Sequence, residues 1–446
     1  MPDHAVSDDP NVQRQLDRLN ALSPGRDILG LERIVALLER LGNPHYRLPP
    51  VLHVAGTNGK GSTCAFLRAA IEASGQSCHV YTSPHLVRFN ERIRLAGSLI
   101  EDTMLAACLE RVLDRADDLG ASFFEVTTAA AFLAFAETPA DACVIEVGLG
   151  GRLDATNVVA DPAVCGIASL GIDHEGFLLA AEAGTPDVPI ERIAFEKAGI
   201  AKNGRPLVVQ RHDMNVMGAV AAQALRAGAI VRARGHDWDA ALYRGRLHYR
   251  DMMGTLSTPL PRLSGAHQLD NAALAIAMLR HQDRLTVPDA ALSAAMGWAD
   301  WPARLQRLDP GPLTALLPDD CQVWLDGGHN PDAGRALAAH FLPEAETVQR
   351  DLHLVIGMLA NKNPAALIAP LSDRLASVAV VPVPGHDCHQ AEAFAACTPK
   401  GVEVNACANV AEALTMLARQ QPQHVLIAGS LYLAGEVLRD NGQPPV

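Results

Sequence analysis

A glycine-rich segment near the N-terminus, residues 56–62, has the residue types of a phosphate-binding loop. It follows an apolar run, residues 51–55, and a helical pattern begins directly after it. Its residues are Gly56, Thr57, Asn58, Gly59, Lys60, Gly61 and Ser62. Glycines let backbone N–H groups turn toward an anion, a helix start adds partial positive charge, and Lys60 would bring a full charge to terminal phosphates. The segment therefore predicts a strand, loop and helix that bind a nucleoside triphosphate.

This loop departs from the common phosphate-loop pattern at two places. Val54 stands where that pattern has its first glycine, and Gly61 separates Lys60 from the hydroxyl of Ser62. An ordinary strand, turn and helix rich in small residues is the alternative interpretation. Lys60 at the exit of the turn favours phosphate binding, because that position suits a cation for the terminal phosphates.

A hydroxyl, a carboxylate and an imidazole stand at the ends of three other apolar runs, as Ser83, Glu146 and His174. Parallel strands end at one edge of a sheet, so these groups would lie near the phosphates. A hard Mg²⁺ ion takes one or two protein oxygens besides phosphate oxygens. The alternatives are a turn cap for Ser83 and a buried ion pair for Glu146, with Lys60 or Lys197 as its partner. Taken together, the three groups favour a magnesium site.

Lys197 stands in a mainly apolar segment, residues 195–200, directly before Ala198 and Gly199. A cation at a helix end is the plainer interpretation, and the residues alone favour it. If Lys197 reached the metal site, burial or a nearby cation would lower its pKa. A neutral amine can react with CO₂ and become an anionic carbamate, which is an oxygen ligand.

Residues 148–157 form a glycine-opened segment with a dense polar tip that includes Asp154. They follow directly on Glu146, so we expect a mobile loop over the phosphate-binding edge that gates access of a substrate. A simple surface turn is the alternative.

Composition indicates a globular enzyme of two domains. The chain has 446 residues, 49% of them hydrophobic and 20% charged. Its net charge of −13 argues against a general nucleic-acid surface, and no run approaches the ~20 apolar residues of a membrane span. The N-terminus lacks a secretion-signal pattern, and nine cysteines without a C-x-x-C pair suit a reducing compartment. We therefore expect a cytoplasmic protein.

The first half alternates apolar runs with helical patterns. The runs at 142–147 and 163–168 predict parallel strands that are buried on both faces. Helices are expected at 103–119, 127–136, 271–280 and 290–296. Short segments with turns at 204–263 predict a small antiparallel appendage.

A second alternation follows a linker at 297–302. Its apolar runs lie at 322–326, 352–357, 377–381 and 424–429. The fold class predicted is therefore α/β: a phosphate-loop domain with a mainly parallel sheet at 1–297, and a second, open α/β (Rossmann-like) domain at 298–446.

The combined motifs resemble the folylpolyglutamate synthase and dihydrofolate synthase family, of the bifunctional bacterial type, whose relatives are the Mur ligases. The resemblance spans about residues 29–435. It is carried by the segments 28–33, 56–62, 82–86, 146–157, 173–174, 196–200, 302–306 and 326–331. It implies an ATP-dependent ligase that converts a carboxylate into an acyl phosphate, which the amine of L-glutamate then attacks. The acids would be dihydropteroate and reduced folates, and the protein would be a monomer.

The resemblance also implies roles for individual residues. ATP would be held by the loop 56–62, Asn271, Arg304 and Asp326. One or two Mg²⁺ ions would be held by Ser83, Glu146 and His174. The catalytic residues would be Lys60, His174 and Lys197. Lys197 would carry a carbamate. The pterin would lie near Leu29, Ser122, Phe124 and Asp154, and glutamate near His329 and Ser430 in the second domain.

Two features depart from the family pattern. Ala303 stands where relatives often have a glycine, and the stretch 175–194 is longer than usual.

Two other functions stay open. A Mur-type ligase for a nucleotide-linked muramoyl peptide would normally carry an extra N-terminal domain, and only about fifty residues precede the phosphate loop. A nucleotide-dependent regulator or transporter ATPase would not need Phe124, Asp154 or the Leu29 segment, and its ATPase activity would not depend on glutamate.

Overall fold

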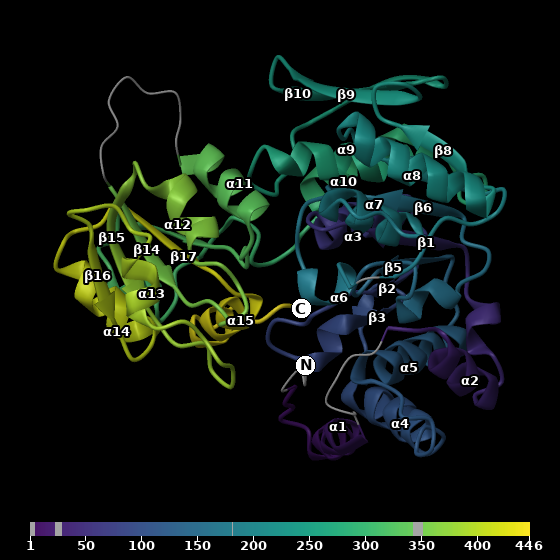
Figure 1. Ribbon diagram of the computed structural model, residues 1–446, viewed down its shortest axis with the longest axis horizontal. Helices are drawn as coiled ribbons and strands as arrows, with labels where there is room; N and C mark the ends of the chain where they lie inside the picture. Colours follow the sequence, from purple (N-terminus) through teal and green to yellow (C-terminus); the bar gives the residue numbers. More distant parts are fainter. Residues whose placement is uncertain (1–4, 23–28, 181, 342–350) are drawn as a thin grey trace. The chain divides into compact units, whose positions relative to one another are not determined.

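A computed structural model describes residues 5–22, 29–180, 182–341 and 351–446 (Figure 1). The chain forms two compact units. The first consists of residues 1–262 and 268–300, and the second of residues 263–267 and 301–446. No helix of the described residues is long and apolar enough to cross a membrane.

An eight-stranded sheet forms the centre of the first unit, in the order β4-β3-β2-β5-β1-β6-β7-β8. All neighbours from β2 to β8 pair in parallel, whereas β3 and β4 are antiparallel additions at one edge. The strands are β1 (Val51–Ala55), β2 (Cys78–Tyr81), β3 (Ile93–Leu95), β4 (Ser98–Leu99), β5 (Ala142–Glu146), β6 (Val164–Ile167), β7 (Pro206–Val209) and β8 (Ile230–Ala233). Every residue of β1, β2, β5 and β6 is buried, which explains why their sequences are apolar except for His53, His79 and Glu146.

Helices cover the sheet and complete two cores. The helices of this unit are α1 (Pro10–Leu22), α2 (Glu32–Arg40), α3 (Lys60–Ala73), α4 (Asp102–Leu113), α5 (Phe123–Glu137), α6 (Glu175–Leu178), α7 (Pro189–Ala198), α8 (Met214–Ala227), α9 (His267–Arg280) and α10 (Asp289–Trp298). Apolar residues of α1, α2, α4 and α5 form one core with β2, β3 and β5. Those of α7 and α8 form another with β6 and β7. Short 3₁₀ turns lie at η1 (Pro44–Arg47), η2 (Phe89–Arg92) and η3 (Ala155–Val158).

The predicted antiparallel appendage is smaller than expected. Only β9 (Trp238–Tyr243), β10 (Arg246–Asp251) and β11 (Gly254–Thr258) form it, and Figure 1 shows β9 and β10 as a ribbon apart from the main sheet. The prediction was wrong for residues 204–233, because β7, α8 and β8 extend the parallel sheet. The edge strand β8 is partly exposed and contains an arginine, so it lacks the apolar run of a central strand.

The second unit has a six-stranded sheet in the order β12-β13-β17-β14-β15-β16, parallel except for β12. Its strands are β12 (Gln306–Arg307), β13 (Gln322–Leu325), β14 (Leu352–Ile356), β15 (Leu375–Val380), β16 (Glu403–Ala406) and β17 (His424–Ala428). Its helices are η4 (Thr314–Leu316), α11 (Pro331–Phe341), α12 (Ala365–Leu371), α13 (Ala391–Ala395), α14 (Val410–Ala418) and α15 (Leu431–Asp440). The sequence pattern missed β16, which is a half-exposed edge strand. The α/β fold class predicted for both parts of the chain is confirmed.

Candidate active site

The phosphate loop connects β1 to α3 in a conformation that needs its glycines. Gly56 and Gly59 have φ values of 153° and 83°, which other residues rarely adopt. A β-carbon on Gly56 would lie 2.9 Å from the Ala168 Cβ, and one on Gly59 would lie 2.3 Å from Asn271 Oδ1. The predicted loop therefore forms, and Asn271 of α9 lies directly on it.

Hydrogen bonds hold the loop against the segment that follows β6. The Thr57 N–H donates to the Ser169 carbonyl at 2.8 Å, and the Thr57 hydroxyl donates to the Gly171 carbonyl at 2.8 Å. The Lys60 ammonium folds back over the loop and donates to the Gly56 carbonyl at 3.1 Å. The lysine charge is thereby kept at the place where the loop would receive phosphate.

Glu146 and Ser83 meet beside this loop. Glu146 ends β5, pairs in register with Val54 of β1 and is only 4% exposed. The Ser83 N–H, two residues past β2, donates to Glu146 Oε2 at 3.4 Å. His174 directly precedes α6, with φ 54°, at the end of the segment bonded to the phosphate loop. That His174 shares an ion with the other two stays a prediction.

The donor types suit a hard cation. In the ranges that the structure describes, no group of three or more His, Cys, Asp or Glu could hold a metal ion. A site with a buried carboxylate and a hydroxyl instead fits Mg²⁺, which takes few protein ligands and completes its shell with phosphate and water. A buried carboxylate such as Glu146 is also costly without a cation or hydrogen bonds.

Lys197 lies in the last turn of α7 and is 4% exposed. Burial lowers the pKa of its ammonium to about 7, and repulsion by Lys60 adds to this effect, while Asp173, Asp154 and Glu196 act in the opposite direction. Lys197 is therefore a helix-end lysine, as the plainer interpretation had it, yet it is buried among the charged groups of the site. Near neutral pH much of it is an uncharged amine.

The polar tip of the segment 148–157 is turned inward, and that this segment gates access of a substrate stays a prediction. Asp154 is buried, and its Oδ2 accepts from the Leu149 N–H at 2.8 Å while Oδ1 accepts from the Thr156 N–H at 3.0 Å and hydroxyl at 2.5 Å. The Thr156 hydroxyl also bonds to the ring of buried His53 in β1 at 2.9 Å. Because these hydrogen bonds connect the segment to itself and to β1, we call residues 148–157 the wall of the site.

An arginine–glutamate network, missed by sequence reasoning, anchors the same segment to α7. Arg152 bonds to Glu196 at 3.0 Å and to Glu182 at 2.5 Å, and Arg192 bonds to Glu182 at 3.0 Å. Glu196 directly precedes Lys197, and Glu182 comes from the unusually long stretch 175–194. Opposite charges in the segments 146–157 and 196–200 were the available signal.

Two of the four pterin candidates, Phe124 and Asp154, lie at this wall. Ser122 caps α5 by accepting from the Glu125 N–H at 3.2 Å. The ring of Phe124 lies against Gly148, where an added β-carbon would be 2.3 Å from Phe124 Cζ. Asp154 belongs to the same segment as Gly148, whereas Leu29 lies three residues before α2.

The candidates of the second unit gather at the ends of β13 and β17. Asp326 Oδ2 accepts from the Leu305 N–H at 2.8 Å, and Oδ1 accepts from the Gly328 N–H at 2.6 Å. A β-carbon on Gly327 would lie 3.0 Å from Arg304 Nη1.

The loop after β13 also carries His329, whose Nδ1 lies 3.0 Å from the Gly327 carbonyl oxygen. The Gly429 N–H donates to the Gly328 carbonyl at 3.1 Å, and Ser430 follows as the cap of α15. Arg304, Asp326, His329 and Ser430 thus share one edge of the second sheet.

Comparisons with known proteins agree with this geometry. Residues 312–440 match the family model described as dihydrofolate synthetase, C-terminal domain. The dihydrofolate synthase/folylpolyglutamate synthase of Escherichia coli is 33% identical over 416 residues, which cover 92% of this chain and 90% of that protein.

Solved structures match over almost the whole chain. The E. coli FolC structure in complex with DHPP and ADP has a TM-score of 0.84 and 31% identity, covering 97% of this chain and 98% of that one. A bifunctional folylpolyglutamate synthase/dihydrofolate synthase with Mn, AMPPNP and L-glutamate bound has a TM-score of 0.81 and 30% identity, covering 96% and 97%. The chain therefore belongs to the dihydrofolate synthase and folylpolyglutamate synthase family of the Mur ligase superfamily.

Proposed function

We propose that this chain is an ATP-dependent ligase that joins L-glutamate to dihydropteroate and to reduced folates. The observation that carries the proposal is a phosphate loop whose Lys60 lies close to the buried Lys197, beside a strand that ends in the buried Glu146. The ligands named for the matched FolC structures, DHPP, ADP, AMPPNP, Mn and L-glutamate, support the same assignment.

The chemistry needs activation of a carboxylate. Transfer of the γ-phosphoryl group of ATP to a carboxylate oxygen gives an acyl phosphate and ADP. The glutamate amine then attacks the carbonyl carbon, loses a proton, and phosphate leaves with the electrons of the broken C–O bond. Lys60 stabilises the negative charge that develops on the transferred group, because it is a fixed cation in a partly desolvated loop.

Ser83, Glu146 and His174 would hold one or two Mg²⁺ ions. A bound Mg²⁺ would neutralise phosphate charge and orient the phosphoryl oxygens. The Ser83 N–H donates to Glu146 Oε2, so the protein itself holds a buried carboxylate beside the proposed metal position.

Lys197 would carry a carbamate. Its neutral nitrogen can bond to the carbon of CO₂ and release a proton, which turns a cation into an anion with two oxygen ligands. A pKa of about 7, caused first by burial, supports this role because only the uncharged amine reacts.

The remaining candidate residues would bind the three substrates. We place the pterin against Leu29, Ser122, Phe124 and Asp154. Asn271, Arg304 and Asp326 would bind nucleotide, and His329 and Ser430 would bind glutamate. We also expect a monomer that acts in the cytoplasm.

Purified protein incubated with ATP, Mg²⁺, glutamate and each pterin acid in turn tests the proposal. We expect ADP release that requires both glutamate and the acid, together with a product heavier than the acid by one glutamyl residue. ATP hydrolysis that ignores glutamate would instead favour a regulator or transporter ATPase, and activity only with a muramoyl peptide would favour a Mur-type ligase.

A further inference from the structure

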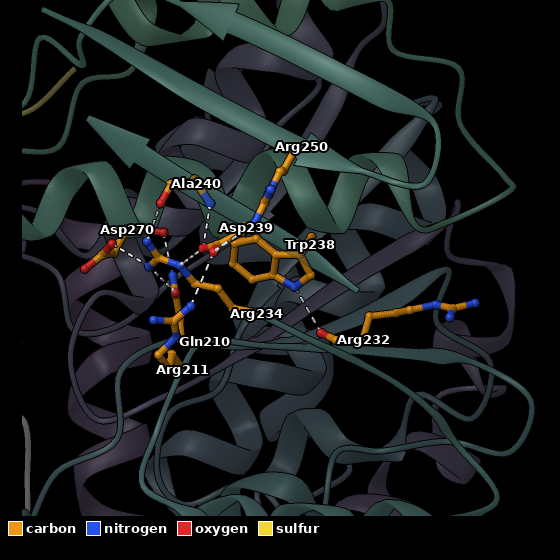
Figure 2. Close-up of polar contacts among 9 residues, drawn as sticks. All are labelled: Gln210, Arg211, Arg232, Arg234, Trp238, Asp239, Ala240, Arg250 and Asp270. Atoms are coloured by element: carbon orange, nitrogen blue, oxygen red, sulfur yellow. Dashed lines mark hydrogen bonds and ion pairs between the residues drawn. The ribbon is translucent and has the colours of Figure 1, made fainter. Parts of the chain in front are cut away.

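A polar cluster around Arg234 connects four elements of the first unit (Figure 2). Its members are Gln210, Arg234, Asp239 and Asp270, and we call them the Arg234 cluster. Gln210 and Arg234 directly follow β7 and β8, Asp239 lies in β9, and Asp270 lies in the first turn of α9. One guanidinium therefore joins the edge of the parallel sheet to the antiparallel ribbon and to the start of a helix.

Arg234 uses each of its nitrogens in this cluster. Its Nη1 donates to Asp270 Oδ1 at 2.6 Å and to Gln210 Oε1 at 3.1 Å. Its Nε donates to Asp239 Oδ1 at 3.3 Å, and its Nη2 donates to the Ala240 carbonyl at 2.9 Å. A lysine could not reproduce this fork of donors, because its ammonium is a single point charge.

The surroundings strengthen these bonds. The Arg234 side chain is 16% exposed, and its guanidinium carbon lies 5.8 Å from the centre of the Trp238 ring. Trp238 is itself buried and donates to the Arg232 carbonyl at 3.0 Å, so the ring is fixed in place. Partial removal from water makes a charge-assisted hydrogen bond stronger than an exposed one.

Asp270 is held at its side chain and at its backbone. In addition to the bond from Arg234, the Gln210 amide donates to the Asp270 carbonyl oxygen at 2.5 Å. The next residue is Asn271, whose side chain occupies the space that a β-carbon on Gly59 would need. The first turn of α9 therefore cannot shift without moving Asn271 on the phosphate loop.

We infer that Arg234 is a positioning residue for the nucleotide: through Asp270 it fixes Asn271 against the phosphate loop. The inference rests on the proposed function only in placing the nucleotide at that loop. It also gives the ribbon β9–β11 a role, because Asp239 and the Ala240 carbonyl of β9 accept hydrogen bonds from the same guanidinium.

The neighbouring Arg211 offers a control. Arg211 bonds to Asp239 at 3.3 Å and is 65% exposed. It lies next to Gln210 in the chain and carries the same charge, yet its bonding partner is Asp239 rather than Asp270.

The test measures the affinity for a fluorescent ADP analogue in the full chain, with no turnover required. The variants are Arg234→Met, Asn271→Ala and the double variant, with Arg211→Met as control. We expect Arg234→Met to weaken binding by about three- to tenfold, and the control to stay within about twofold. In the Asn271→Ala background, Arg234→Met should have no further effect, because the path through Asn271 is already lost.

Steady-state kinetics separate positioning from general damage. Arg234→Met should raise the KM for ATP and leave the KM for the pterin acid unchanged. If Arg234→Met does not fold, Asp270→Asn, at a half-exposed position, removes the same ion pair and should act in the same direction.

Three results would overturn the inference: unchanged ADP affinity in Arg234→Met or Asn271→Ala, losses that multiply in the double variant, or an equal rise in both KM values. Wild-type protein that binds ADP but does not ligate contradicts the proposed function alone. Wild-type ligation with an unaffected Arg234→Met contradicts this inference alone.

Discussion

At the scale of single residues, the first prediction concerns the charged side chains of Lys60 and Glu146. Lys60→Ala and Glu146→Ala should each abolish ligation while the fold survives. Each removes one charge from the proposed phosphate and metal cluster, and loss of one such stabilising group costs about 10²–10³ in rate. Activity assays measure the loss, and circular dichroism checks folding. Near-normal turnover in either variant would remove that residue from the site.

The second prediction concerns Lys197, whose proposed role depends on a reversible modification by CO₂. Activity should fall when CO₂ and bicarbonate are stripped from the assay and recover when bicarbonate returns. Recovery should be stronger at pH 8 than at pH 6, since burial lowers the pKa of Lys197 to about 7 and the reactive neutral amine is populated above that value.

A variant of Lys197 and electron density at its side chain complete the test. Lys197→Ala should be nearly inactive, and a short-chain acid in the medium should restore part of the activity by replacing the carbamate oxygens. A bare ammonium in electron density, together with activity indifferent to bicarbonate, would return Lys197 to the role of a buried helix-end lysine.

At the scale of elements, the wall 148–157 changes what Asp154 is expected to do. The carboxylate accepts three hydrogen bonds from its own segment, so it shapes the wall as well as offering an acceptor to the pterin. Asp154→Ala should impair dihydropteroate ligation more than ATP binding. It should also lower the free energy of unfolding by about 1–3 kcal/mol, because buried donors lose their partner.

Asp154→Asn serves as the matched variant for this wall. Its amide oxygen can still accept from Thr156, although its NH2 group would face the Leu149 N–H. Less stability should therefore be lost than in Asp154→Ala, while a charged acceptor for pterin N–H groups is lost. Substrate KM values and urea unfolding distinguish the two effects. An equal loss of ATP affinity in either variant would make the wall part of the nucleotide site.

The segment at 303–305 gives a second prediction at this scale. Ala303 is buried and has φ 57°, a conformation that favours glycine. Ala303→Gly should therefore raise the free energy of unfolding by about 0.5–1 kcal/mol, since relief of the left-handed strain exceeds the entropy that glycine loses. Thermal unfolding measures the change, with Ala299→Gly as a control at a position with φ −61° that should lose stability. Destabilisation by Ala303→Gly would show that the strain is absent.

At the scale of the whole molecule, the sequence predicted the central strands, which are continuous apolar runs, and the phosphate loop, which has a glycine pattern. Strands such as 142–147 and 424–429 were correct because they are buried on both faces. The edge strand β8 was not, since its half-exposed residues resemble a turn. Asn271 was named by resemblance alone, because no local pattern reveals a contact with Gly59. Arg234 was missed for a similar reason: an arginine after an edge strand looks like a solvated residue until tertiary structure surrounds it.

The last prediction concerns how nucleotide binding stabilises the molecule. A ligand that binds only the folded state adds about 2.7 kcal/mol at one hundred times its Kd. ADP with Mg²⁺ should therefore raise the thermal midpoint of the unit that holds the phosphate loop. Hydrogen exchange of peptides from β1, α3 and β5 assigns the effect to that unit, and peptides from β14 and β15 provide an internal reference. Lys60→Ala should abolish the protection, because the charge that holds the phosphates is gone. Protection that persists in Lys60→Ala, or that never reaches β1 and α3, would place the nucleotide away from the glycine-rich loop.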